Sequence, residues 1–335
     1  MKKHILFIAV LCITFTLITR VKAQDKNLYT LDKTIALPGD GGYDYLYIDQ
    51  QNNKLYVSHG NSVNIIDLKT ESFIGTIDSL QGVHGITIVN SIGKGFITDG
   101  KTNSVIVFDI KSNKRLTTIP LSGKKPDAII YDIYSNKVFA FNGGSSNISV
   151  IDVDILKEIS TITLDGAPEF ATADGHGLIF NNIENKNSIK LIDSKNLRII
   201  KTFQLSNCKE PSGLAIDTTN KRLFTVGGES KTMSVIDYNG NEIATLPIGG
   251  GVDAVTYDPV TKLVYCSCGE GVTTIIKQES ADKYAVVQTL ITQKRARTMA
   301  LDTYTHKIYL SVADFVVGTR TPIKGSFKVL VYKLN

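Results

Sequence analysis

The sequence predicts an all-β protein, a seven-bladed β-propeller, and three observations lead to this prediction. A unit of about 42 residues recurs along most of the chain. Each unit holds four short apolar segments separated by turn-forming residues, which is the pattern of antiparallel strands joined by tight turns. The helical spacing of apolar residues is absent from the repeats. Four strands at this period are typical of one propeller blade.

The clearest landmark of the repeat is an apolar strand that ends in aspartate. It recurs at intervals of 41 to 44 residues, at Asp67, Asp109, Asp152, Asp193 and Asp237. Such a carboxylate can accept a hydrogen bond from the backbone N–H two residues further on, so we expect it to stabilise the turn that follows. Two further landmarks recur upstream, a turn with its apolar strand at 53–57, 136–140, 220–224, 261–265 and 305–309, and a strand start at 126–128, 168–170, 211–213 and 252–254.

The third unit predicts strands over 127–131, 137–141, 148–152 and 158–164. The first strands of the seven blades are expected near Tyr43, Val83, Asp127, Glu169, Ser212, Asp253 and Arg297. The seventh unit has no fourth strand of its own, whereas segment 28–37 resembles one. We therefore expect this N-terminal strand to join the C-terminal blade and close the ring, which removes exposed sheet edges.

The N-terminus predicts an export signal. Lys2 and Lys3 precede an apolar run over 5–18, and a short segment ending in Ala23 follows. We expect cleavage after Ala23, so that 1–23 is a signal peptide, 24–335 is the propeller, and the protein is periplasmic or secreted. The run is shorter than the roughly 20 apolar residues of a membrane span, although an uncleaved anchor remains the alternative.

The net charge argues against nucleic acid as a partner. The full chain carries +5, and the signal contributes four cations and no acid, so cleavage lowers the net charge to +1. A nucleic-acid surface needs a clustered excess of Lys and Arg, which the mature chain lacks. We expect a monomer with no membrane span after cleavage, whose partner is a small molecule or a protein.

The mature chain keeps an odd number of cysteines, Cys208, Cys266 and Cys268, so at least one thiol is unpaired within the chain. A bridge between Cys208 and Cys268 and three separate buried thiols are both compatible with the sequence. Several chemistries are excluded by motif: there is no Cys-x-x-Cys-His for c-type haem, no tryptophan for a quinoprotein propeller, and no phosphate-binding glycine loop.

The repeat residues resemble the YVTN-type propeller family, and in particular its YncE-like exported proteins. Segments 53–58 and 234–237 carry the resemblance, which extends over almost the whole mature chain. It implies the propeller fold and an extracytoplasmic location, but no single chemistry, because propellers host many activities. The sixth unit departs from the pattern with Lys277 in place of the aspartate, and the seventh carries a long insert at 313–326.

Polar residues at two positions of each blade predict the binding site. The start of the first strand and the end of the second open onto one face of a propeller, around the mouth of the central channel. The candidate ligand-binding residues at or near these positions are Asp44, His59, His84, Asp127, Asn142, Glu169, Glu184, Asp253, Arg295 and Arg297. Gathered acids are costly without a compensating cation, although a water-filled polar funnel is the simpler alternative.

His59 and His84 lie in neighbouring blades, and we expect both to reach the mouth. Two imidazoles and a carboxylate suit a divalent metal, which is the one cofactor that the sequence suggests. A glycine follows each histidine and would allow a ligand to approach the backbone closely.

The leading interpretation is an exported propeller that binds a small molecule or a partner protein at this mouth. The alternative is a lactonase-like hydrolase or lyase that uses a metal or a His/acid pair, with Arg297 holding an anionic substrate. A scaffold that binds through its blade rims is a third interpretation, and the sequence does not decide whether the protein is an enzyme. The insert at 313–326 is expected to be either a lid over the mouth or a disordered segment.

Overall fold

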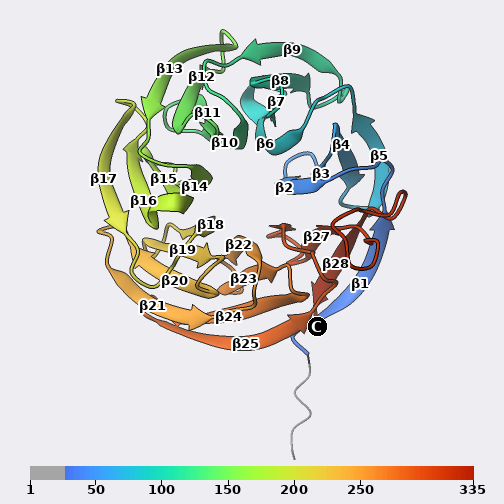
Figure 1. Cartoon of the computed structure of the whole chain (residues 1–335), viewed down its shortest axis with the longest axis vertical. Coiled ribbons are helices and arrows are strands. Elements are labelled where there is room, and N and C mark those ends of the chain that lie inside the picture. The colour runs from blue at the N-terminus through green and yellow to red at the C-terminus, as the bar shows by residue number, and fades with distance from the viewer. Residues whose placement is uncertain (1–26) are drawn as a thin grey trace, which may run out of the picture.

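The computed structural model describes residues 27–335 and confirms the predicted fold. Seven four-stranded antiparallel sheets form a ring around a central channel (Figure 1). The helices among these residues are two single turns, η1 (Asn90–Ile92) and η2 (Glu184–Lys186). The predicted signal at 1–23 lies outside the described residues. Over 27–335, no helix is both long enough and apolar enough to span a membrane.

Each blade runs from the channel to the rim in chain order. The first three blades are β2 (Tyr43–Asp49), β3 (Lys54–His59), β4 (Ser62–Asp67) and β5 (Ser72–Ile77); β6 (Val83–Val89), β7 (Lys94–Asp99), β8 (Ser104–Asp109) and β9 (Arg115–Pro120); β10 (Pro126–Asp132), β11 (Lys137–Asn142), β12 (Asn147–Asp152) and β13 (Lys157–Thr163).

The next three blades follow the same order. They are β14 (Pro168–Ala173), β15 (Leu178–Ile183), β16 (Ser188–Asp193) and β17 (Arg198–Gln204); β18 (Pro211–Asp217), β19 (Arg222–Gly227), β20 (Thr232–Asp237) and β21 (Glu242–Pro247); β22 (Val252–Asp258), β23 (Leu263–Cys268), β24 (Val272–Ser280) and β25 (Lys283–Ile291).

The seventh blade is completed by the N-terminal strand, as predicted. It holds β26 (Met299–Leu301), β27 (Ile308–Val312), β28 (Lys328–Leu334) and β1 (Tyr29–Ala36). Strand β1 pairs antiparallel with β28, from Tyr29 opposite Leu334 to Ala36 opposite Lys328. The chain therefore closes the ring with its own two ends, and no blade edge is left open between them.

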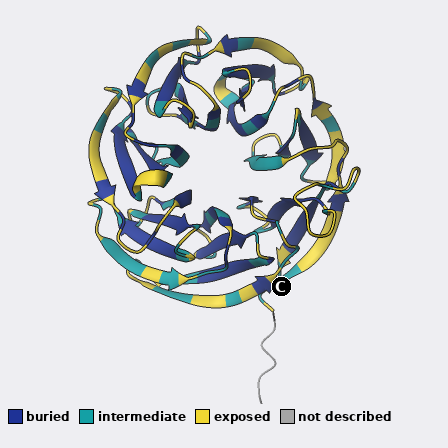
Figure 2. Cartoon of the chain, in the orientation of Figure 1, coloured by how far each residue is buried: buried dark blue, intermediate teal, exposed yellow. Residues whose placement is uncertain are grey.

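The hydrophobic core lies between neighbouring blades. The two middle strands of a blade are covered on both faces, so they are almost wholly buried, as in β11 and β12. The outermost strand β13 alternates exposed and half-buried residues, and this contrast recurs around the ring (Figure 2). Phe139 and Phe141 of the third blade, for example, pack with Ile179 and Ile192 of the fourth. Continuous apolar segments thus form the middle of each blade, and alternating ones form the rim.

The strand-ending aspartates stabilise turns, as predicted. Asp152 accepts the N–H of Asp154, two residues on, at 3.0 Å, and Asp67 accepts that of Thr70, three residues on, at 2.7 Å. A second set, which the sequence analysis did not anticipate, does the same between the first and second strands; Asp258 accepts the N–H of Val260 at 2.9 Å. Both sets lie at the end of the ring opposite to the mouth.

The three cysteines of the described chain are free and buried. The structure therefore favours separate thiols over a bridge between Cys208 and Cys268. Burial raises the pKa of Cys208 to about 12 and that of Cys268 to about 11. These thiols are packing groups, because the thiolate is the reactive form.

Candidate functional site

The candidate residues lie on a bulge that recurs at the start of the first strand. In the third blade Pro126 pairs with Asn142 and Ile129 with Ala140, so the two residues between them on the first strand face one residue on the second. The same single extra residue occurs in the other blades from the first to the sixth. A bulge turns a side chain away from the plane of the sheet. It lies at Asp44, His84, Asp127, Glu169, Ser212 and Asp253, one in each blade.

Neighbouring blades hold the backbone of these residues. The hydroxyl of Thr98, in the second blade, donates to the backbone oxygen of Asp127 in the third at 2.5 Å. Ser267 donates in the same way to the backbone oxygen of Arg297. A Cβ at Gly85 would lie 2.7 Å from the backbone oxygen of Asp127. The glycine after His84 is therefore needed for close packing against the third blade. This corrects the expectation that a ligand approaches there.

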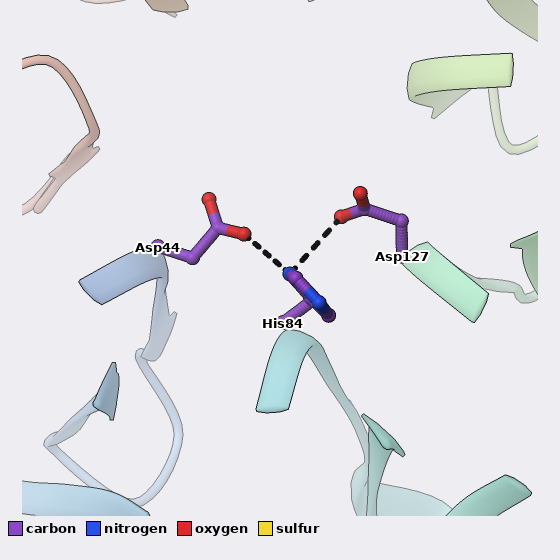
Figure 3. A group of neighbouring side chains, drawn as sticks. All are labelled: Asp44, His84 and Asp127. Carbon is purple, nitrogen blue, oxygen red and sulfur yellow. Dashed lines mark hydrogen bonds and ion pairs between the residues drawn. The ribbon is translucent and has the colours of Figure 1, made fainter. Parts of the chain in front are cut away.

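Three side chains converge at the mouth, from β2, β6 and β10 (Figure 3). His84 Nδ1 donates to Asp44 Oδ2 at 2.6 Å and lies 3.7 Å from Asp127 Oδ1. Burial alone would lower the pKa of His84. The hydrogen bond to Asp44 and the charges of both aspartates outweigh burial and raise that pKa. Ligand atoms of the three residues lie within 4.8 Å of one another, a spacing that could hold a metal ion.

Four carboxyl groups around the channel form what we call the acid cluster: Asp44, Asp127, Glu169 and Asp253. Burial and the neighbouring carboxylates raise the pKa of Asp127 to about 7 and that of Glu169 to about 9. Burial also raises the pKa of Asp253, to about 6, against the opposing charge of Arg297, whose guanidinium lies 3.2 Å away. Asp127 and Glu169 therefore retain protons near neutral pH.

An aromatic pair spans the channel beside the acid cluster. Tyr45 of β2 and Phe170 of β14 stack with ring centroids 4.5 Å apart, although their blades face each other across the ring (Figure 1). Burial, and after it the charge of Asp127, raises the pKa of Tyr45 well above its ordinary value. Sequence analysis missed this pair because an aromatic residue near the start of a strand fits the same sequence pattern as a residue of the hydrophobic core.

A cavity of about 1080 Å³ opens above the Asp44–His84–Asp127 group. We call it the funnel. Loops of the first three blades line it, together with Arg297. Three lysines that sequence analysis also missed, Lys101, Lys124 and Lys125, belong to its lining. We call them the lysine rim.

The structure brings together six of the predicted site residues, namely the acid cluster with His84 and Arg297, and places the other four elsewhere. His59 is buried and stacks on Phe327 with centroids 3.7 Å apart. It lines a separate cavity of about 170 Å³, and burial lowers its pKa. The predicted pair of His59 and His84 is therefore not formed. Asp44 and Asp127 take the place of His59 beside His84.

The remaining three residues have other contacts. Asn142 is buried and donates from its amide to Asn147 and Ser149, both at 2.9 Å, so it stabilises its own hairpin. Glu184 does not line the funnel, and burial and the charge of Glu210 raise its pKa. Its own charge contributes to the raised pKa values of Glu169 and Asp253, so it borders the acid cluster. Arg295 lies over the Phe315 ring at 3.9 Å and donates to the Thr319 oxygen at 2.7 Å. These contacts tie Arg295 to the insert, and it does not line the funnel.

The insert at 313–326 is an ordered loop that lies outside the channel, beside β28 (Figure 1). Phe315 packs against Tyr43, and the N–H of Gly325 donates to Asp40 at 3.3 Å. Among the described residues that line the funnel, none comes from the insert. In Figure 1 it is the red loop beside β28, outside the channel. The expectation of a disordered segment is wrong, and the loop does not cover the funnel as a lid in this structure.

Comparison with known proteins supports the fold and goes no further. No family model matches this chain, and no curated protein matches it. Among solved structures it is similar to the structure of U3-55K, with a TM-score of 0.76 at 9% sequence identity; the match covers 90% of this chain and 98% of that one. The likeness shows a seven-bladed β-propeller. Resemblance to the YVTN-type family remains a prediction from the repeat residues.

Proposed function

We propose that this protein is an exported propeller that binds a positively charged small molecule in the funnel. The observation that carries the proposal is the acid cluster, of which Asp44 and Asp127 line the funnel. The pKa of Asp127 is raised to about 7 and that of its neighbour Glu169 to about 9. Like charges gathered in a buried place destabilise one another unless a cation compensates them. Arg297 lies 3.2 Å from Asp253, and His84 lies between Asp44 and Asp127, whereas Glu169 has no ion pair within the described chain. A cationic ligand would supply the positive charge that these two side chains leave uncompensated.

Proton release on binding tests this proposal. A cationic ligand favours the ionised carboxylates, so binding near pH 7 should expel protons from the acid cluster. A thermal-shift screen of amines and other cationic metabolites would find the ligand. Calorimetry in two buffers of different ionisation enthalpy would then count the protons. We expect net release in the wild type and weakened binding, by about tenfold or more, in Asp127→Asn.

Asp154→Asn is the matched control, because Asp154 is exposed and lies at the opposite end of the third blade. It should bind as the wild type does. Binding that releases no proton and is equally strong in Asp127→Asn would contradict the proposal. The same screen tests the scaffold interpretation, which predicts protein partners that are retained by Asp127→Asn.

A divalent-metal site is the second candidate, and the convergence of Asp44, His84 and Asp127 favours it. One imidazole and two carboxylates are a common donor set for such ions. A bound ion would supply an activated water for a hydrolase or lyase. Metal analysis of protein purified without chelator should then give about one ion per chain in the wild type and in His176→Ala, and none in His84→Ala. His176 is the control because it is exposed on a distant turn. Equal metal content in both variants would overturn this candidate.

Export is part of the same proposal, and the order of residues in segment 1–23 supports it. Expression of the full chain in a bacterial host, followed by fractionation and N-terminal sequencing, tests it. We expect the periplasmic or secreted protein to begin at Gln24. A protein that keeps Met1 and stays with the membrane would show an uncleaved anchor instead.

A further inference from the structure

The lysine rim gives the funnel charges of both signs. Lys101 lies on the loop after β7, and Lys124 and Lys125 lie on the loop before β10. All three line the same cavity as Asp44, His84 and Asp127. Each is exposed, and none forms an ion pair with a carboxylate of the described chain, whereas Lys190 and Lys307 do. The rim therefore offers positive charge that the protein itself does not neutralise.

The turn that carries two of these lysines is fixed by its neighbours. The Lys124 N–H donates to the Ser145 hydroxyl at 2.8 Å, and the Lys125 N–H donates to the Asn103 amide oxygen at 2.9 Å. The N–H groups of Gly143 and Gly144 donate to the backbone oxygens of the same two lysines at 3.0 Å. All backbone groups named here are paired, so the turn presents its side chains from a rigid base.

The rim and two acids of the cluster, Asp44 and Asp127, line one cavity. Lys125 precedes Asp127 by two residues, and the stem of Lys101 crosses Gly82, where an added Cβ would lie 3.0 Å from its Cγ. Gly82 in turn precedes His84 by two residues. A simple anion would be repelled by the acid cluster, and a simple cation by the rim. A ligand that carries one charge of each sign matches both.

We propose that the funnel binds a zwitterionic small molecule, an amino acid or a related amine that carries an oxyanion. Its carboxylate or phosphate lies at Lys101, Lys124 and Lys125, and its ammonium group lies at Asp44 and Asp127. The inference rests on the proposed function and deepens it by naming the ligand class. Charge-assisted hydrogen bonds at both ends give the selectivity.

Titration calorimetry on the mature protein tests the two-ended site. The probes are glycine, β-alanine, γ-aminobutyrate and ε-aminocaproate, with butylamine and butyrate as one-ended counterparts of γ-aminobutyrate. Aminoethyl phosphonate tests phosphate-type oxyanions against carboxylates. We expect the best two-ended probe to bind about tenfold or more tightly than either one-ended compound. Equal affinity for butylamine, or no binding by any two-ended probe, would overturn the inference.

Lys125→Gly is the decisive variant, because Lys125 has a φ of 49°, a left-handed conformation that glycine adopts without strain. It should leave the melting temperature unchanged or higher and weaken the best probe by about tenfold or more. Lys221→Gly is the matched control: Lys221 has a φ of 54° and lies in the far turn of the fifth blade. It should have the same effect on melting and none on binding.

The outcomes separate this inference from the function on which it rests. A ligand whose binding is lost in Asp127→Asn but kept in Lys125→Gly would leave cation binding in place and overturn the lysine contact. Loss of the probe in both variants, with Lys221→Gly unaffected, supports both. Wild-type binding in both variants overturns both.

Discussion

The two ends of the propeller use aspartate in opposite ways. At the turn end, hydrogen bonds from Thr70 lower the pKa of Asp67, and those from Asn196 lower that of Asp193. At the mouth, burial raises the pKa of Asp127 and of Asp253. The residue type is the same at both ends of the blades. The free energy of ionisation moves in opposite directions.

Backbone donors account for the difference. A turn places two or more N–H groups in front of a carboxylate, so the charge is compensated within four residues of the chain. The bulge at the mouth turns a carboxylate into the channel, where its neighbours are other carboxylates. Acids that lack backbone donors are those available to a ligand. This distinction separates the aspartates that stabilise turns from those that we propose bind a ligand, in a repeat where both are common.

Removing a turn aspartate should have the largest effect on stability. Asp258 is fully buried and accepts from the Val260 N–H, the Thr261 hydroxyl at 2.8 Å and His306 Nδ1 at 2.6 Å. Asp258→Ala leaves these donors unpaired and should lower the free energy of unfolding by about 3 to 5 kcal/mol. Denaturant unfolding of the wild type and the variant measures this loss. Asp127→Asn should cost far less, and equal losses in the two variants would refute the comparison.

Neutralising a mouth acid should instead stabilise the protein at high pH. The folded-state pKa of Glu169 is about 9, against an ordinary value of 4.5, so its contribution is present below about pH 4.5 and is lost as the pH rises to about 9. Glu169→Gln stays neutral throughout. Full burial would give about 5 kcal/mol near pH 8, since each pH unit above 4.5 contributes about 1.4 kcal/mol. Glu169 is partly exposed and solvent screens its charge, so we expect Glu169→Gln to exceed the wild type by about 2 kcal/mol in unfolding free energy near pH 8, and by almost nothing near pH 4.5. A difference independent of pH would show that Glu169 acts through packing.

The smallest effect is expected at Arg297, whose side chain is half exposed. Arg297→Ala leaves Asp253 without its cation, so the ionised form of Asp253 becomes less favourable. Near pH 8 the free energy of unfolding should fall by roughly 1 kcal/mol, and near pH 5, where Asp253 is mostly protonated, the loss should be smaller. Denaturant unfolding at the two pH values checks this, and Arg297→Lys should recover part of the loss. A larger loss near pH 5 than near pH 8 would contradict it.

The blades could be predicted because their signals are local. The strands expected over 127–131 and 137–141 are found at Pro126–Asp132 and Lys137–Asn142. An apolar segment covered on both faces has the same pattern in every blade, and the aspartate turn is complete within a few residues. Because every blade has four strands and the last unit of the sequence has three, the N-terminal segment that became β1 could be predicted to complete it.

The site was predictable only in part. Asp44, His84 and Asp127 were expected because they hold equivalent positions in successive blades. The predicted position of His59 at the mouth was wrong, because the ends of the second strands differ from one blade to the next. Its ring stacks on Phe327 instead. Whether a polar side chain enters the channel or packs beside it depends on contacts with residues far away in the chain.

By itself, then, the sequence determined the seven blades, their order and the closure by β1, because each depends on local periodicity. The tertiary structure alone decided the character of the funnel. The contact between Tyr45 and Phe170, the pairing of His84 with Asp44, and the lysine rim above them all join different blades. Their energies come from distances across the ring and from burial, which no single repeat encodes.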